Sequence, residues 1–261
     1  MDRFSRGLAM LLLVLAAPLS VATELTPHKA EYKVRVSIVS GQLNTELRKT
    51  DNGYVATHIV KATGLSRVLT DGVMMVTSEF SSVDDGVRAM TYHAVDTVRH
   101  EPETKITFDW VDHVARGTVG DEPVELPLDG ISHDAVSIQY ELMDDLLNKR
   151  YNDTYVLFDI EKMRVAHIRV IGRKTVETKA GEYQVIGIQH QKEGSSRVTT
   201  MWCAPALDYL PVVIEQHRKG KLNFSASLTS YTPLDDSGPD DNLPRTADTT
   251  APNSSLMPAT E

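Results

Sequence analysis

The sequence predicts a mainly β protein, with a curved antiparallel sheet or open barrel-like meander and one amphipathic helix packed in or over it. Short runs with two-residue alternation recur along residues 23–232, separated by turn signals such as Asp51-Asn52-Gly53. No helical pattern separates consecutive runs, which argues against a parallel sheet built from βαβ units. Only residues 132–148 show the 3.6-residue period of an amphipathic helix.

The clearest strand signals lie in residues 195–231. Successive residues of 198–203 alternate between two faces, and Pro211 is tolerated as the first residue of a second strand. A hairpin turn is expected at 219–221, where Gly220 can adopt a positive φ. The third strand has one apolar face, formed by Leu222, Phe224, Ala226 and Leu228.

The earlier parts of the chain give further strands of the same kind. Gly41 is expected to break the first long run, and residues 64–70 are ambiguous. The predicted strands are 29–39, 42–50, 54–62, 73–80, 87–95, 104–110, 113–119, 154–159, 164–174 and 182–191.

Residues 132–148 are expected to form the helix. Ser132 can cap its amino end, and Asp134 complements the positive end of the helix dipole. Lys149 and Arg150 suit the opposite end. The apolar stripe is formed by Ala135, Ile138, Leu142 and Leu146, widened by Met143 and Leu147. A single helix of this type usually plugs or covers an open sheet.

The two ends of the chain differ from this β-rich domain. Residues 1–22 combine basic residues, an apolar run and a small-residue cleavage site, which predicts a secretory signal peptide, with an uncleaved anchor as the alternative. No membrane span is expected after cleavage. Residues 233–261 are rich in Pro, Asp, Ser and Thr and predict a disordered acidic tail.

Composition limits the possible functions. The chain has 27 Lys and Arg against 36 Asp and Glu, a formal net charge of −9, which argues against nucleic-acid binding. Cys203 is the single cysteine, so no intramolecular disulfide can form, and we expect it to be a buried, inert thiol. No feature of the sequence indicates an oligomeric state.

Motifs for catalysis, cofactors or metals are missing, and we predict no cofactor and no metal site. His93, His100 and His113 can converge with Asp109 or Asp112, but their spacing is not diagnostic of a metal site. Strand histidines at the surface are the preferred interpretation. Residues 132–134 read Ser-His-Asp, and capping explains them more simply than catalysis.

Four large side chains are candidates for the walls of a ligand cavity between the sheet and the helix. A curved sheet that is capped by one helix often leaves an apolar hollow, and aromatic rings suit its walls. The alternative is a solid core in which the same residues pack together. The four candidates are Trp110, Trp202, Leu142 and Phe224.

Several segments resemble a known bacterial family. They are 108–110 (Phe-Asp-Trp), Leu126-Pro127 followed by Asp134 and the helix, 178–181 leading to Met201-Trp202, and 210–214 continuing to Tyr231. Together, from about residue 30 to 231, the chain resembles domain of unknown function 3108. The resemblance implies a secreted or periplasmic, β-rich, barrel-like protein without established catalytic residues. Cys203 and the tail lie outside that pattern.

Two functions remain as hypotheses. The first is a non-enzymatic periplasmic envelope protein that binds a lipid, another apolar or amphipathic envelope component, or a protein partner. The second is a hydrolase of an envelope polymer that uses carboxylates such as Asp109 and Asp134, because paired carboxylates can be assembled from distant positions without a motif. The missing nucleophile and metal motifs favour the first.

Overall fold

The computed structural model describes residues 23–37, 39–68, 70–150, 152–160 and 162–235. The first half contains β1 (His28–Val36), β2 (Val39–Thr50), β3 (Gly53–Ala62), the 3₁₀ helix η1 (Gly64–Val68), β4 (Val73–Val83), β5 (Gly86–Asp96), β6 (Glu101–Asp109), β7 (Val114–Val119) and β8 (Glu122–Pro127). The second half contains β9 (Ser132–His133), α1 (Ser137–Leu147), β10 (Thr154–Asp159), β11 (Lys162–Thr178), β12 (Gly181–Lys192), β13 (Arg197–Ala204), the 3₁₀ helix η2 (Pro205–Leu207), β14 (Leu210–Arg218) and β15 (Lys221–Pro233).

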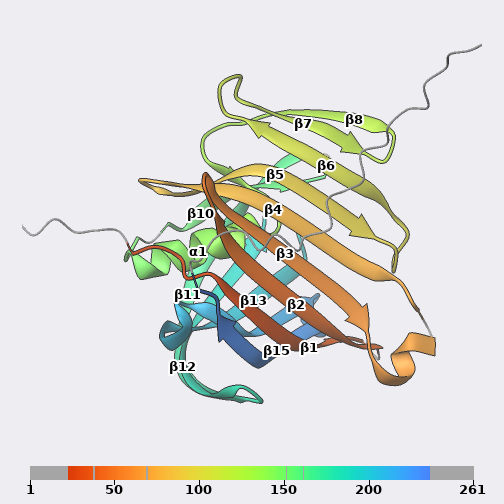
Figure 1. Cartoon of the computed structure of the whole chain (residues 1–261), viewed down its shortest axis with the longest axis vertical. Helices are drawn as coiled ribbons and strands as arrows, with labels where there is room; N and C mark the ends of the chain where they lie inside the picture. Colours follow the sequence, from red (N-terminus) through yellow and green to blue (C-terminus); the bar gives the residue numbers. More distant parts are fainter. Residues whose placement is uncertain (1–22, 38, 69, 151, 161, 236–261) are drawn as a thin grey trace, which may run out of the picture.

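All fifteen strands of the described residues belong to one sheet (Figure 1). Its order is β8-β7-β6-β5-β4-β3-β2-β1-β15-β14-β13-β12-β11-β10-β9, so two meanders meet where the first strand pairs with the last. Neighbours are antiparallel except β9 and β10, which run parallel. The edge strands β8 and β9 do not pair with each other in the described part of the chain. The predicted open antiparallel meander is therefore confirmed.

The sheet rolls up without closing. Near its edges, β9 contacts β5 and β8 contacts β11, while α1 packs against β4 and β5. The two halves of the sheet thus face each other, and α1 lies near one end of the roll, as Figure 1 shows. This arrangement covers part of the apolar interior that an unclosed sheet would otherwise expose.

The helix starts later than predicted. Ser132 and His133 form β9, which pairs with Val156 and Leu157 of β10, so Ser132 is not the helix cap. The N-cap residue is Val136, and the side chain of Asp134 satisfies the start of the helix: its Oδ1 accepts hydrogen bonds from the backbone N–H of Val136 (2.7 Å) and Ser137 (2.9 Å). The local sequence allowed either structure for residues 132–133, and pairing with β10 decided it.

The buried stripe of α1 is confirmed. Ile138, Leu142 and Leu146 pack against β10, β11, β12 and β13 in one cluster, which also buries Cys203 as predicted. Burial raises the pKa of the Cys203 thiol to about 12. Ala135, which was expected on the stripe, lies before the start of the helix and is exposed.

Two further clusters complete the core. The larger one joins β1, β2, β3, β4 and α1, and the rings of Phe80 and Tyr140 stack in it with centroids 5.2 Å apart. The other surrounds Phe108 and Phe158, whose rings meet edge to face at 6.2 Å. Aromatic pairs of this kind add about 0.5–1.5 kcal/mol each beyond their buried area.

Several strand boundaries differ from the prediction. Gly41 lies inside β2 instead of ending a strand, and a Cβ there would stand 2.8 Å from the carbonyl oxygen of Lys61, so close backbone approach explains this glycine. The ambiguous segment contains η1. The strand β8 was not predicted, and β11 extends beyond the predicted residues 164–174 to Thr178.

The ends of the described chain lie together. The last strand reaches Pro233, one residue into the predicted tail, and the N–H of Leu234 donates to the carbonyl of Pro27 at 2.8 Å. The predicted signal peptide (1–22) and almost all of the predicted tail lie outside the described residues. Within the residues described, no helix has the length and apolarity to cross a membrane.

Candidate functional site

A cleft of about 700 Å³ opens at the end of the sheet that holds α1, and we call it the helix-side cleft. Asp85 enters it from the β4–β5 turn, Asp129 from the β8–β9 connection, and Thr154 from the start of β10. Glu141 of α1 also lines it. The cleft therefore lies beside the unpaired edges β8 and β9, where the sheet does not close.

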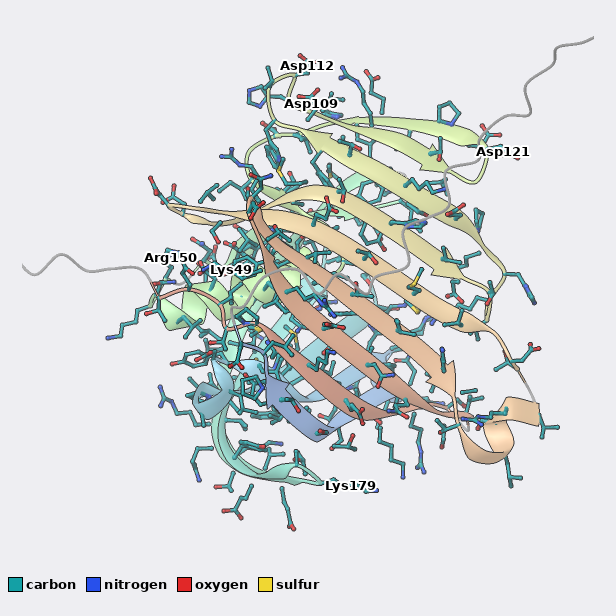
Figure 2. All side chains as sticks on the ribbon, in the orientation of Figure 1. Lys49, Asp109, Asp112, Asp121, Arg150 and Lys179 are labelled. Atoms are coloured by element: carbon teal, nitrogen blue, oxygen red, sulfur yellow. The ribbon has the colours of Figure 1, made fainter. Side chains whose placement is uncertain are left out.

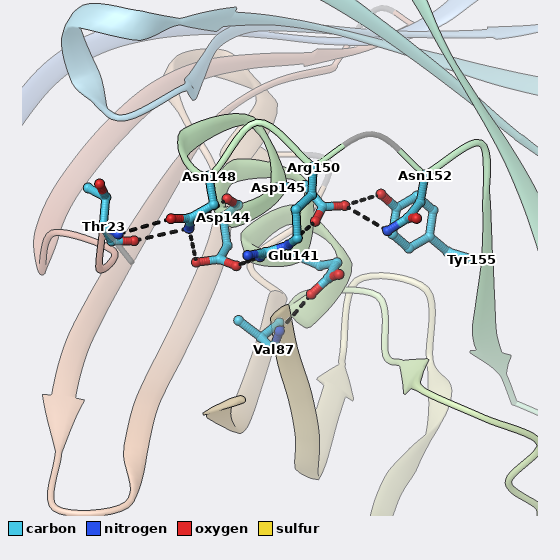
Figure 3. Close-up of polar contacts among 9 residues, drawn as sticks. All are labelled: Thr23, Val87, Glu141, Asp144, Asp145, Asn148, Arg150, Asn152 and Tyr155. Atoms are coloured by element: carbon cyan, nitrogen blue, oxygen red, sulfur yellow. Dashed lines mark hydrogen bonds and ion pairs between the residues drawn. The ribbon is translucent and has the colours of Figure 1, made fainter. Parts of the chain in front are cut away.

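A network of polar groups, several of them buried, borders the cleft (Figure 3). Asp145 is 3% exposed, and its Oδ1 accepts from Nε of Arg150 at 2.9 Å. Its Oδ2 accepts from the Tyr155 hydroxyl and from Nδ2 of Asn152 at 3.3 Å. Arg150 also forms an ion pair with Asp144. These contacts compensate the buried charge, which would otherwise be costly to desolvate.

Tyr155 is the donor in its contact with Asp145. Burial, followed by the hydrogen bond to the Asp145 carboxylate, raises the pKa of Tyr155 well above its ordinary value, so the phenol keeps its proton. Nearby, Asn148 takes two contacts with the amino-terminal segment: it accepts from the N–H of Thr23 at 2.9 Å and donates to the Thr23 carbonyl at 3.2 Å. Figure 3 shows that these contacts continue the network toward Thr23.

Glu141 is the most unusual ionisable group of the site. It is 2% exposed, and its Oε2 accepts from the backbone N–H of Val87 at 2.6 Å. Gly86 has φ +139°, which other residues rarely adopt, and a Cβ there would stand 2.3 Å from the same oxygen, so any other residue would displace this carboxyl. Burial raises the pKa of Glu141 to about 8, with smaller contributions from Asp145 and Asp144. At neutral pH this side chain mostly keeps its proton.

His133 lies in the wall of the cleft, and one of its ring nitrogens lacks a hydrogen-bond partner in the described structure. The residue is 1% exposed, and its ring meets Tyr155 edge to face at 5.9 Å. Its Nδ1 is buried and has no hydrogen-bond partner in the described structure. Burial lowers the pKa of His133 to about 4, so the ring is neutral. A buried polar atom without a partner is costly, and a bound ligand can satisfy it.

A smaller pocket of about 210 Å³ borders the same network. It shares Arg150, Asn152 and Tyr155 with the helix-side cleft, and its apolar wall includes Leu142 and Ile188. The residues of the network thus lie between the helix-side cleft and a smaller pocket, which also has a mixed polar and apolar lining.

Of the four predicted cavity residues, only Leu142 lines either of the two pockets described above, while Trp202 and Phe224 pack against the same hydrophobic cluster. Leu142 lines the smaller pocket. Trp110 packs on the Phe108 cluster and donates to the Ala89 carbonyl at 2.7 Å. Trp202 lies on the other face of β13 from Met201 and Cys203, and the Lys174 ammonium stands 3.6 Å from its ring centroid. Phe224 packs partly buried against the largest cluster.

The two carboxylates considered for hydrolysis have no common contact. Asp109 is half-buried at the end of β6, where its Oδ1 accepts from the N–H groups of Val111 and Asp112. Figure 2 shows it well away from Arg150, which marks the helix end. Asp134 is fully buried, where it caps α1 and accepts from the Ser78 hydroxyl at 2.6 Å. Its role in the structure is capping, as expected for residues 132–134.

The three histidines considered for metal binding are dispersed. His93 contacts Glu103 at 2.6 Å, and His100 and His113 occupy turns with φ 55°. The described residues contain no group of three or more His, Cys, Asp or Glu side chains placed to hold a metal ion.

Sequence reasoning missed Glu141, Asp145, Arg150 and Tyr155. One signal was present: Glu141 and Asp145 lie one helical turn apart beside the apolar stripe, so burying the stripe brings them inward. Their partners Val87 and Tyr155 come from distant strands, and no local pattern identifies them.

Fold and site together define a rolled, unclosed antiparallel sheet with an internal helix and a mixed polar and apolar cleft at its open edge. The sequence profile of the family described as protein of unknown function DUF3108 matches residues 29–222. The chain belongs to this family. The comparison with curated proteins gave no significant match.

Proposed function

We propose that this protein is a non-enzymatic envelope protein of the periplasm that binds a lipid or similar amphipathic component in the helix-side cleft. The observation that carries the proposal is the cleft itself. Its volume of about 700 Å³ lies within the range typical of small-molecule sites. Export signals predicted in residues 1–22 support the location.

The lining of the cleft suits a ligand with one polar and one apolar part. Ile131, Val156 and Val165 supply apolar surface. Glu141 and His133, which line the same cleft, supply buried polar groups, one protonated at neutral pH and one with a free ring nitrogen. Polar groups at fixed positions beside apolar surface orient a ligand that has both a polar and an apolar part.

Filling the cleft tests the proposal. Thr154 is exposed and lines the cleft, so Thr154→Trp should block it at small cost to folding. Thr107→Trp, at an exposed position of β6, is the matched control. A bound lipid should raise the wild-type Tm by about 5 °C or more at about a hundredfold excess over Kd. The control should respond equally, and the blocked variant should not.

Native mass spectrometry of protein purified from the periplasm identifies the class of ligand from the mass of any molecule that co-purifies. The proposal fails if no fatty acid or phospholipid class shifts the Tm of the wild type. It also fails if Thr154→Trp responds as the wild type does, because binding would then lie elsewhere.

Glu141 supports a second candidate function, hydrolysis of an envelope polymer. A carboxyl that holds its proton at neutral pH is what a general acid requires, and Asp85 and Asp129 line the same cleft. Release of soluble fragments from such a polymer, lost in Glu141→Gln, would establish hydrolysis over binding.

A further inference from the structure

The end of the sheet opposite the helix-side cleft exposes large aliphatic side chains on neighbouring turns. We call this region, residues 35–37, 39–40, 61–68, 70–73 and 218–223, the turn rim. Leu65 is 90% exposed and Val68 is 86% exposed, both on η1. Leu222 at the start of β15 is 52% exposed, and Val36 at the end of β1 is 39% exposed. Side chains of this size gain free energy when they leave water.

Hydrogen bonds hold the three turns of the rim side by side. The N–H of Ser37 donates to the Asn223 carbonyl at 3.3 Å, which links the β1–β2 turn to β15. Ser40 of β2 donates to the Ser66 hydroxyl at 2.9 Å, which fixes η1 beside the same turn. Figure 1 shows η1 as the short orange coil that follows β3, next to the ends of β1 and β2.

Leu65 and Val68 share one face of η1. Residues i and i+3 of a 3₁₀ helix lie above one another. Ser66, between them in sequence, is 8% exposed and faces β2 through its hydrogen bond. The inward serine and the two outward aliphatic side chains give η1 a polar buried side and an apolar solvent side.

The rim is basic, although the whole chain carries a net charge of −9. All of its basic side chains are exposed, and none has an ion-pair partner in the described structure: Arg35, Lys61, Arg67, Arg218, Lys219 and Lys221. Asp71 is the one acidic residue among the described residues of the rim. At physiological ionic strength the screening length is about 8 Å, so the local charge of the rim dominates what a nearby surface meets.

We propose that the turn rim docks on an anionic lipid surface, with Leu65 and Val68 entering the headgroup boundary and the basic side chains contacting lipid phosphates. Aliphatic side chains flanked by Lys and Arg are what an interfacial anchor uses. Separate turns with mainly positive charge suit a fluid headgroup layer, which does not require a fixed pattern of partners. A protein interface instead has a continuous, desolvated apolar centre.

The test is co-sedimentation of the chain beginning at Thr23 with vesicles of phosphatidylglycerol and phosphatidylcholine, compared with phosphatidylcholine alone. The wild type should bind the anionic vesicles, and binding should weaken as NaCl is raised. Leu65→Ser with Val68→Ser should weaken it about tenfold or more. Lys219→Glu with Lys221→Glu should weaken it and reduce its dependence on salt.

Val111→Ser is the matched control. Val111 is also 90% exposed, but it lies in the β6–β7 turn at the other end of the sheet, and its loss should leave vesicle binding unchanged. Three results overturn the proposal: no binding to anionic vesicles, equal binding to phosphatidylcholine alone, or an equal loss in Val111→Ser. A protein as the true partner would give the first result. Because the rim and the cleft lie at opposite ends, either proposal can fail without the other.

Discussion

The two ends of the rolled sheet differ in how far their side chains are buried and paired. At the helix end, carboxyl groups are buried deeply and each has partners: Asp134 is 0% exposed, Glu141 2% and Asp145 3%. At the turn rim, Leu65 and Val68 face water with no packing to hold them. Folding therefore fixes the chemistry of the helix end, because an unpaired buried group is costly. At the rim, folding places few demands on the exposed side chains, which leaves them available for contacts with other molecules.

The largest effect is expected at the helix end, from Leu142→Asp. Leu142 is 5% exposed between Glu141 and Asp145, so the variant would bury an unpaired charge among carboxyl groups. We expect a loss of several kcal/mol in the free energy of unfolding, or aggregation. Urea denaturation followed by circular dichroism measures it. Leu65→Asp at the rim is the control, expected within about 0.5 kcal/mol of the wild type. A soluble Leu142→Asp protein with an unchanged midpoint would remove the contrast between the ends.

A smaller effect on the free energy of unfolding, one that depends on pH, is expected from the ionisation of Glu141. Its pKa in the folded protein is about 8 against an ordinary value of 4.5, so between these values the folded state holds a proton that the unfolded state has lost. The contribution of Glu141 to stability should therefore fall as the pH is raised from about 5 to 8, on the order of a few kcal/mol. Buried His58, His133 and His190, whose pKa values are lowered to about 4, contribute the opposite trend below about pH 6.5, so the wild type is compared with Glu141→Gln. Glu141→Gln keeps an acceptor for the Val87 N–H and should remove the Glu141 contribution from the pH profile.

Unfolding midpoints in urea at pH 5, 7 and 8.5 test that expectation. Glu31→Gln, at an exposed position of β1, is the control and should keep the wild-type slope. Parallel pH profiles for the wild type and Glu141→Gln would mean that Glu141 is ionised in the fold and that the helix end is more hydrated than its burial indicates.

The smallest change in the free energy of unfolding is expected from substitutions at the turn rim. Leu65→Ser with Val68→Ser should change the free energy of unfolding by about 0.5 kcal/mol or less, since neither side chain packs against the core. The same urea series measures it. A loss well above 1 kcal/mol would show that η1 supports the sheet, and the contrast between the two ends would then be one of degree.

Much of the fold was readable from local pattern. Two-residue alternation located most strands, and the stripe Ile138, Leu142 and Leu146 located the helix, because each signal depends only on which face is buried. The pairing of β1 with β15 had no such signal, since it joins residues such as Ala30 and Tyr231. The start of α1 was misplaced because residues 132–133 are decided by a neighbour, β10, that is distant in sequence.

The site was less predictable for the same reason. The four cavity candidates are large side chains on faces expected to point inward. Trp202 alternates with Met201 and Cys203, so it lies on the face opposite to theirs and packs against a different cluster. The polar groups that border the helix-side cleft come from several elements. Glu141 meets Val87, and Asp145 meets Tyr155, only after the sheet has rolled.

The pairing of the first strand with the last has a consequence for how the chain acquires its structure. His28 faces Pro233 across the β1–β15 ladder, so the middle of the sheet is completed by residues from the two extremes of the domain. Strand pairings across such a sequence separation form slowly, because chain entropy must be lost before the contacts are made. A chain that emerges amino end first would hold β1 with one edge unpaired until β15 arrives. During that interval the apolar residues of β1, Ala30, Tyr32 and Val34, lack their final neighbours, and protection from aggregation is needed most.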